Sequence, residues 1–124
     1  MQRHVLSRFN PHLLAVVRDA AILAGAHRAL MKSFHVDVLQ SGDAAQTYLL
    51  RNQVVTHVLC EDVLAEDVHR FLTETLRSPV HFLVLGGASL SLAGRGVRST
   101  PKPPDADRIL VDFKRLEEAY ADAA

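Results

Sequence analysis

Residues 12–19 read HLLAVVRD, and this stretch decides the fold. Five apolar residues follow one another from Leu13 to Val17, and the run ends in the charged pair Arg18 and Asp19. A short, wholly apolar run of this kind is typical of a strand that is buried on both faces inside a parallel sheet. Residues just beyond such a strand lie at its carboxyl edge, where open α/β sheets place their ligand sites. We therefore expect Arg18 and Asp19 at the edge that carries any function.

The rest of the chain continues an alternation of strands and helices. Apolar spacings of three and four predict helices, and short apolar or alternating runs predict strands. In order, we expect a helix over 20–34, a strand over 35–40, a helix over 44–51 capped by Ser41, a strand over 54–60, a helix over 65–77, a strand over 80–85, one helical turn and a short strand within 88–100, and a last helix capped by Asp105 or Asp107. This alternation predicts an α/β fold, a doubly wound five-stranded parallel sheet with a shortened fourth helix.

Length and composition restrict the class of protein. The chain has 124 residues, which we divide into an N-terminal extension over 1–11 and one domain over 12–124. Fourteen basic residues balance fourteen acidic ones, so no net charge favours nucleic acid or an anionic membrane. The chain lacks a signal-peptide core and an apolar stretch of the roughly 20 residues that span a bilayer. With Cys60 as the single cysteine, we expect a cytoplasmic protein.

Over residues 12–122 the chain resembles the receiver domain of bacterial response regulators. VVRD at 16–19 is similar to the first strand and its trailing acidic pair. HVLCED at 57–62 is similar to the third strand, which ends in the phosphorylated aspartate, and KP at 102–103 is similar to the lysine–proline step after the fifth strand. The resemblance implies a flavodoxin-like sheet of strand order 2-1-3-4-5, with these three segments meeting at the carboxyl edge.

Two substitutions depart from what the resemblance implies. In the family, acids after the first and third strands hold Mg²⁺, an ion that demands oxygen ligands in near-octahedral geometry. Arg18 stands where one of these acids is expected, and its permanent positive charge repels the ion and competes for the same carboxylates. Gly86 stands where the family has a Ser or Thr hydroxyl that binds the phosphoryl group. Glycine offers no such hydroxyl.

The phosphoacceptor position is open between Glu61 and Asp62. Counting from His57 and from Asp19 favours Asp62, whereas a slip of one residue places Glu61 there, and a glutamate could not take the phosphoryl group in the usual way. Lys102 matches the lysine that contacts the phosphoryl group in active relatives. Here we expect it to form a salt bridge to Asp62 or Asp19.

These residues predict an atypical receiver-like signalling domain that works through protein–protein contacts, is not phosphorylated, and needs no cofactor or catalytic activity. Its degenerate pocket comprises Arg18, Asp19, Glu61, Asp62, Gly86 and Lys102. The pocket is either a permanently set switch or a vestige whose charges compensate one another. We expect a protein partner or a second copy to bind beside the shortened fourth helix, the fifth strand and the last helix, where apolar surface is left uncovered.

Two other functions remain open. One is a functional, Mg²⁺-dependent phosphoacceptor receiver of a two-component system. The other is a small nucleotide- or flavin-binding module, in which the turn at 86–89 would present backbone N–H groups to an anion. No GxGxxG or P-loop pattern accompanies that turn.

Histidines begin four of the expected strands or stand near their starts. They are His12, His35, His57 and His81. Strand starts share the amino edge of a parallel sheet, so a metal-binding or pH-sensing cluster is one interpretation. We favour separate edge histidines, because the strand order should keep the side chains from converging on one ion. Cys60, in a buried strand, is expected to be an inert core residue.

Overall fold

A computed structural model describes residues 11–123, and it contains one parallel sheet of five strands. The strands are β1 (His12–Val16), β2 (His35–Leu39), β3 (His57–Glu61), β4 (His81–Leu85) and β5 (Arg98–Thr100). Their spatial order is β2-β1-β3-β4-β5, with every neighbouring pair parallel. The predicted fold class and strand order are confirmed. Apart from Pro11, the proposed N-terminal extension lies outside the described residues.

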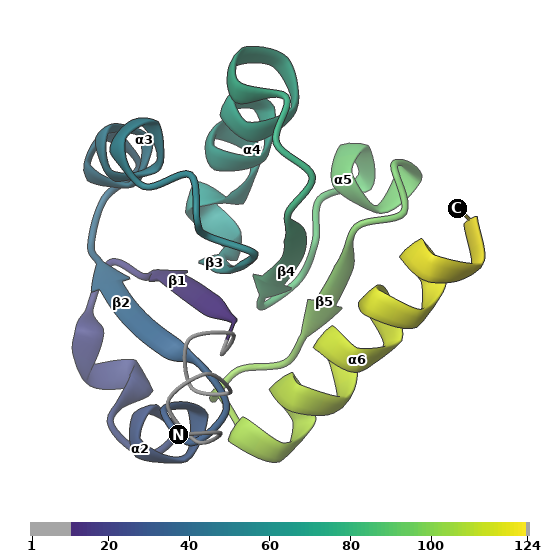
Figure 1. Cartoon of the computed structure of the whole chain (residues 1–124). Helices are drawn as coiled ribbons and strands as arrows, with labels where there is room; N and C mark the ends of the chain where they lie inside the picture. Colours follow the sequence, from purple (N-terminus) through teal and green to yellow (C-terminus); the bar gives the residue numbers. More distant parts are fainter. Residues whose placement is uncertain (1–10, 124) are drawn as a thin grey trace, which may run out of the picture.

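Helices cover both faces of this sheet (Figure 1). One face packs against α3 (Gly42–Arg51), α4 (Asp62–Arg70) and α5 (Leu90–Gly94), and the other packs against α2 (His27–Leu30) and α6 (Ala106–Ala123). The central strand β1 contributes alternately to the two cores: Leu14 and Val16 belong to the first, and Leu13 and Ala15 to the second. Because β1 is buried on both faces, its sequence has no polar alternation.

The segment 20–34 differs from the single amphipathic helix that its spacing predicts. It forms a 3₁₀ helix, η1 (Ala20–Leu23), then a turn, then the one-turn α2. Gly25 lies in that turn, and glycine disfavours a continuous helix by about 1 kcal/mol relative to alanine. Leu23, Ala26 and Leu30 are nevertheless buried, as the spacing predicts, whereas Met31 of the same expected stripe is 56% exposed. The spacing therefore indicated most of the buried face, but the predicted continuity of the helix and the burial of Met31 were wrong.

Two other boundaries differ from the prediction. β3 begins at His57 rather than at residue 54, and α4 begins at Asp62 rather than at residue 65, directly after the last residue of β3. α4 continues into the π-helical segment η2 (Phe71–Leu76), which ends at Arg77 in the left-handed conformation. Glu61 therefore ends β3 and Asp62 begins α4, with no loop between the strand and the helix.

The remaining elements follow the prediction closely. Ser41 caps α3 by accepting a hydrogen bond from the Ala44 backbone N–H at 3.1 Å. α5 has only five residues, which confirms the shortened fourth helix. Of the two candidate caps of α6, Asp105 fills the position, because its Oδ1 accepts from the backbone N–H of Asp107 at 3.0 Å. None of the described helices combines the length and hydropathy that crossing a membrane requires.

Candidate functional site

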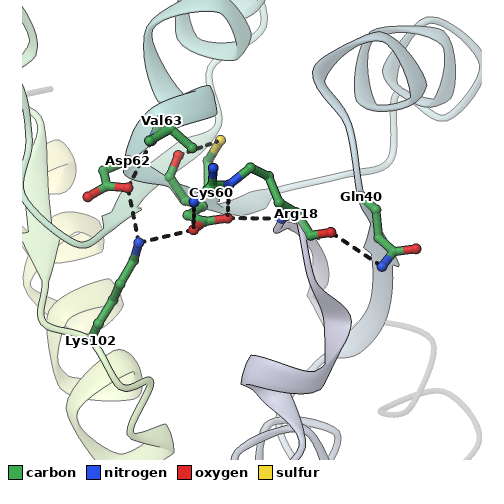
Figure 2. A network of polar contacts seen from close by, with 7 residues as sticks. Arg18, Gln40, Cys60, Asp62, Val63 and Lys102 are labelled. Atoms are coloured by element: carbon green, nitrogen blue, oxygen red, sulfur yellow. Dashed lines mark hydrogen bonds and ion pairs between the residues drawn. The ribbon is translucent and has the colours of Figure 1, made fainter.

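Five of the six predicted pocket residues meet at the carboxyl edge of the sheet: Arg18, Glu61, Asp62 and Lys102 form a network of polar contacts (Figure 2), and Gly86 lies against Asp62. Arg18 follows β1, Glu61 ends β3, Asp62 begins α4, and Lys102 follows β5. Parallel strands deliver the residues after their carboxyl ends to one edge, so segments about 40 residues apart in sequence come together here.

Glu61 is the centre of this cluster, and its side chain is only 6% exposed. Its Oε1 accepts hydrogen bonds from the Arg18 backbone N–H at 2.9 Å and from Arg18 Nε at 3.4 Å. Its Oε2 accepts from Arg18 Nη2 at 3.2 Å and from Lys102 Nζ at 3.0 Å. Both carboxylate oxygens are therefore committed to cations, which satisfies a buried charge that would otherwise be costly.

The charges in the cluster stabilise one another. Burial raises the pKa of Glu61, but the hydrogen bonds from Arg18 and Lys102 outweigh it and bring this pKa to about 2. The same hydrogen bonds, with the attraction of Glu61, raise the pKa of Arg18, and the bonds to Glu61 and Asp62 raise that of Lys102. Arg18, Glu61 and Lys102 are consequently charged at neutral pH. The two cations and two carboxylates sum to zero.

Asp62 lies one residue further along, at the start of α4, and its side chain is 30% exposed. Its Oδ1 accepts from Lys102 Nζ at 3.1 Å and from the Val63 backbone N–H at 2.9 Å. The other side of the carboxylate lies over Gly86, which has a φ of 113°. A Cβ added to Gly86 would lie 2.7 Å from Asp62 Cγ and still closer to Oδ2, so the carboxylate fills the space of the missing side chain.

Asp19 takes no part in the hydrogen bonds and ion pairs that join Glu61 and Asp62 to their cations, within the described residues. Its Oδ1 accepts from the Ala21 backbone N–H at 2.9 Å and so caps η1. Within residues 11–123, no hydrogen bond or ion pair joins Asp19 to Lys102, which bonds Glu61 and Asp62 instead. Of the two alternative partners expected for the salt bridge of Lys102, Asp62 is the one that the structure shows.

The cluster has no arrangement suited to a divalent cation. Over the described part of the chain, no three His, Cys, Asp or Glu side chains converge on a point that a metal ion could occupy. Magnesium requires several free oxygen ligands, whereas both oxygens of Glu61 already accept hydrogen bonds from cations. The residues present therefore do not fit the Mg²⁺ ion that the resemblance implies.

A cavity of about 450 Å³ opens beside the cluster. Ile22, Pro103 and Pro104 form its apolar lining, and Glu61 and Lys102 complete it. The peptide bond between Lys102 and Pro103 is cis. Sequence reasoning identified Lys102 but missed Ile22, whose position on the expected helix predicted only core packing.

Two neighbouring residues, Gln40 and Cys60, complete the surroundings of the cluster. Gln40, just beyond β2, donates from Nε2 to the Arg18 carbonyl at 3.5 Å (Figure 2). Sequence reasoning missed this residue, although its place after a strand was a usable signal. Cys60 is fully buried, and burial raises the pKa of its thiol to about 12, which fits the expected inert core residue.

The four histidines lie at the opposite, amino edge, and each is the first residue of its strand. The expectation that the strand order separates them was wrong for neighbouring strands: the ring centroids of His12 and His35 are 5.7 Å apart, and those of His57 and His81 are 4.9 Å apart. The two pairs lie on opposite faces of the sheet. His57 is the register partner of Leu13 and shares its face, whereas His12 precedes Leu13 in β1 and so points to the other face.

Comparison with known proteins is informative at the level of structure. No protein-family model matches the chain, and no curated protein matches it in sequence. Among solved structures, a signal receiver domain from Vibrio parahaemolyticus is similar, with a TM-score of 0.74, 16% identity, and coverage of 94% of this chain and 99% of that chain.

Two other solved structures give the same result. A response regulator from Desulfuromonas acetoxidans has a TM-score of 0.72 and 16% identity, covering 88% of this chain and 98% of its own. The pseudo-receiver domain of the CikA protein has a TM-score of 0.63 and 22% identity, covering 86% and 96%. The chain therefore has the fold of a response-regulator receiver domain.

Proposed function

We propose that this chain is a pseudo-receiver, a signalling domain with a receiver fold whose phosphorylation pocket is held in one state by its own cations. The observation that carries the proposal is the commitment of both Glu61 oxygens to Arg18 and Lys102. Glu61 is the last residue of β3, and we assign it, rather than Asp62, to the phosphoacceptor position. A glutamate there is longer than the aspartate that receivers phosphorylate.

The pocket is electrostatically complete without a phosphoryl group. Phosphorylation normally adds negative charge that reorganises nearby cations. Here the buried carboxylate of Glu61 already holds the lysine and an additional arginine, so a further anion would have to displace existing charge-assisted bonds. We therefore propose a fixed switch with no resident Mg²⁺ or other cofactor and no catalytic role.

Protein–protein contact is the function that remains for such a domain. Large apolar side chains are exposed on the two helices that flank β5 in Figure 1: Leu90 on α5 is 94% exposed, and Val111 and Tyr120 on α6 are 46% and 60% exposed. Exposed apolar groups of this size are typical of partner surfaces when they gather. We propose that a partner or a second copy of the chain binds this flank, in the reducing cytoplasm that the lone Cys60 suits.

A working phosphoacceptor is the second candidate function, and one observation favours it. The carboxylate of Asp62 is more exposed than that of Glu61 and lies 3.1 Å from Lys102 Nζ. An incoming phosphodonor would reach Asp62 first.

Incubation with Mg²⁺ and a small phosphodonor, followed by intact-protein mass spectrometry, separates the two functions. We expect no added phosphoryl group on the wild-type chain. A gain of one phosphoryl group that is lost in Asp62→Asn and kept in the matched variant Asp67→Asn, an exposed aspartate further along α4, would contradict the pseudo-receiver assignment.

Sedimentation analysis tests the proposed surface. We expect concentration-dependent association that Leu90→Asp and Val111→Asp weaken, while Val54→Asp leaves it unchanged. Val54 is 65% exposed but lies outside α5, β5 and α6. A chain that remains monomeric at every concentration would exclude the second copy as the occupant.

A further inference from the structure

The amino edge of the sheet contains a buried imidazole that the proposed function does not use. His57 is only 5% exposed and lies on the face that α6 covers. Phe34 and Phe113 contact its ring edge-on, each with its centroid 5.0 Å from that of the imidazole, and the ring of His81 lies 4.9 Å away. An aromatic cover of this kind favours an uncharged ring.

Both ring nitrogens of His57 have polar partners. Nε2 lies 3.1 Å from Glu117 Oε2, on α6, and Nδ1 lies 2.7 Å from Thr56 Oγ1. An ionised carboxylate only accepts hydrogen bonds, so Nε2 carries the proton in the neutral ring. Nδ1 then accepts from the Thr56 hydroxyl, whose oxygen accepts from the His12 backbone N–H at 3.2 Å.

The same partners accommodate a second proton. When Nδ1 is protonated it donates to Thr56 Oγ1, and the hydroxyl can turn towards the His12 carbonyl oxygen at 3.3 Å. A rotation of one hydroxyl therefore keeps every polar group paired in both states. What changes on protonation is the cost of burying a positive charge beneath two phenyl rings and beside a second imidazole.

We propose that His57 is an acid-operated latch, which holds the C-terminal half of α6 on the sheet while its ring is neutral and releases it when the ring is protonated. α6 supplies most of the removable cover: Phe113 and Glu117 contact His57, and Tyr120 contacts His81 with ring centroids 5.9 Å apart. Lifting this part of α6 hydrates both imidazoles at once, whereas β3 and β4 are fixed within the sheet.

The groups that face His57 favour this direction of the switch. β4 contributes His81, which opposes a positive charge, and α6 contributes Glu117, which favours one. Phe34, before β2, and Leu13, the partner of His57 on β1, are apolar. Burial lowers the pKa of His57, the hydrogen bond to Glu117 raises it, and His81 lowers it, with a net lowering. Glu117 is half exposed, so its attraction is screened by solvent.

The pH window follows from this lowering. An imidazole whose pKa is lower in the folded chain stays neutral there while the released state takes up a proton, so α6 docking weakens as pH falls below the reference value of 6.5. At pH 5.5 a single reference imidazole is about tenfold more often protonated than neutral, which limits the effect of one ring to about tenfold.

Hydrogen exchange on the full chain at pH 7.5 and 5.5 tests the latch. We expect the protection factors of residues 113–120, corrected for the intrinsic effect of pH, to fall by up to tenfold on acidification, while those of α3 change much less. His57→Gln, which can still donate to Glu117 but does not titrate, should abolish the difference. His35→Gln, an exposed histidine on the other face, should retain it.

Three results would overturn the latch. They are an equal fall of protection in α3 and α6, a pH response that persists in His57→Gln, and no fall in the wild-type chain. If His57→Gln does not fold, the NMR titration of the His57 ring in the wild-type and Glu117→Gln chains decides. If the latch is correct, the titration midpoint of His57 lies below pH 6.5 in the wild-type chain and lower still in Glu117→Gln. A midpoint at or above pH 6.5 in the wild-type chain refutes it.

Discussion

Arg18 binds the carboxylate of Glu61 in two ways, through its guanidinium and through its backbone N–H. The backbone N–H would be present with any residue at position 18, so it fixes Glu61 whatever the side chain. The guanidinium adds the charge that makes the pocket unsuitable for a cation. A substitution at position 18 should therefore change cation binding and leave the fold unchanged.

Arg18→Asp should create divalent-cation binding. The substitution replaces a cation with a carboxylate beside Glu61, with Asp19 next in the chain, and Mg²⁺ prefers such oxygen clusters. For a dissociation constant of about 1 mM, 10 mM Mg²⁺ should raise the melting temperature of the variant by about 5 °C and leave the wild type unchanged. Thermal unfolding with and without Mg²⁺ is the measurement.

Arg18→Gln is the matched control, because it removes the positive charge without adding an acid. We expect no Mg²⁺ effect on that variant. An Arg18→Asp chain that is equally insensitive would show that the carboxylates do not converge, consistent with Asp19 remaining at its cap on η1.

Gly86→Ser should destabilise the chain rather than restore the hydroxyl that receivers carry. The new Cβ would collide with Asp62, and a φ of 113° is unfavourable for any residue with a side chain. We expect a loss of about 1–3 kcal/mol in the free energy of unfolding, measured by urea denaturation. Gly87→Ser, where no atom lies within 4 Å of an added Cβ, is the control and should cost much less.

At the scale of the elements, uniform apolar runs predicted strands more reliably than spacings predicted helices. β1 and β4 are buried along nearly their whole length, and such runs leave few alternative structures. In the segment 20–34, the spacing of the buried side chains fits a continuous helix. It fits equally well the 3₁₀ helix, turn and single α-helical turn that the structure has. The sequence marks its interruption only by Gly25, and the cost of glycine in a helix, about 1 kcal/mol, is too small to predict a break by itself.

The cap of α3 was predicted from Ser41 alone, and its contribution can be measured. The hydroxyl accepts from the backbone N–H of Ala44, a donor that has no partner within the helix. Ser41→Ala should lower the free energy of unfolding by about 1 kcal/mol in chemical denaturation. Ser33→Ala, at an exposed position before β2, should change it by less than about 0.5 kcal/mol, and equal effects would contradict a capping role.

At the scale of the whole molecule, topology explains which site residues could be predicted. Arg18, Asp62 and Lys102 were expected at one edge because each follows or borders a strand end, and they lie together. The sequence left Glu61 and Asp62 open, since two consecutive acids at a strand end differ only in the direction of their side chains. That direction depends on where β3 ends, and the apolar pattern does not mark this boundary.

The stability of the whole chain should depend on acid through Glu61. Its folded pKa of about 2 lies below the ordinary 4.5, so the stabilisation by the charged carboxylate is complete above pH 4.5 and is lost as pH falls towards 2.

Glu61→Gln removes this charge-dependent stabilisation. The substitution leaves Arg18 and Lys102 without their shared carboxylate, which should cost about 1–3 kcal/mol near neutral pH. The difference in melting temperature between wild type and Glu61→Gln should therefore be several degrees at pH 6 and should vanish near pH 2. Asp37, whose pKa the hydrogen bonds from Tyr48 and His12 lower, titrates in both chains and cancels in this difference. A difference that stays constant from pH 6 to pH 2 would show that Glu61 contributes by packing alone.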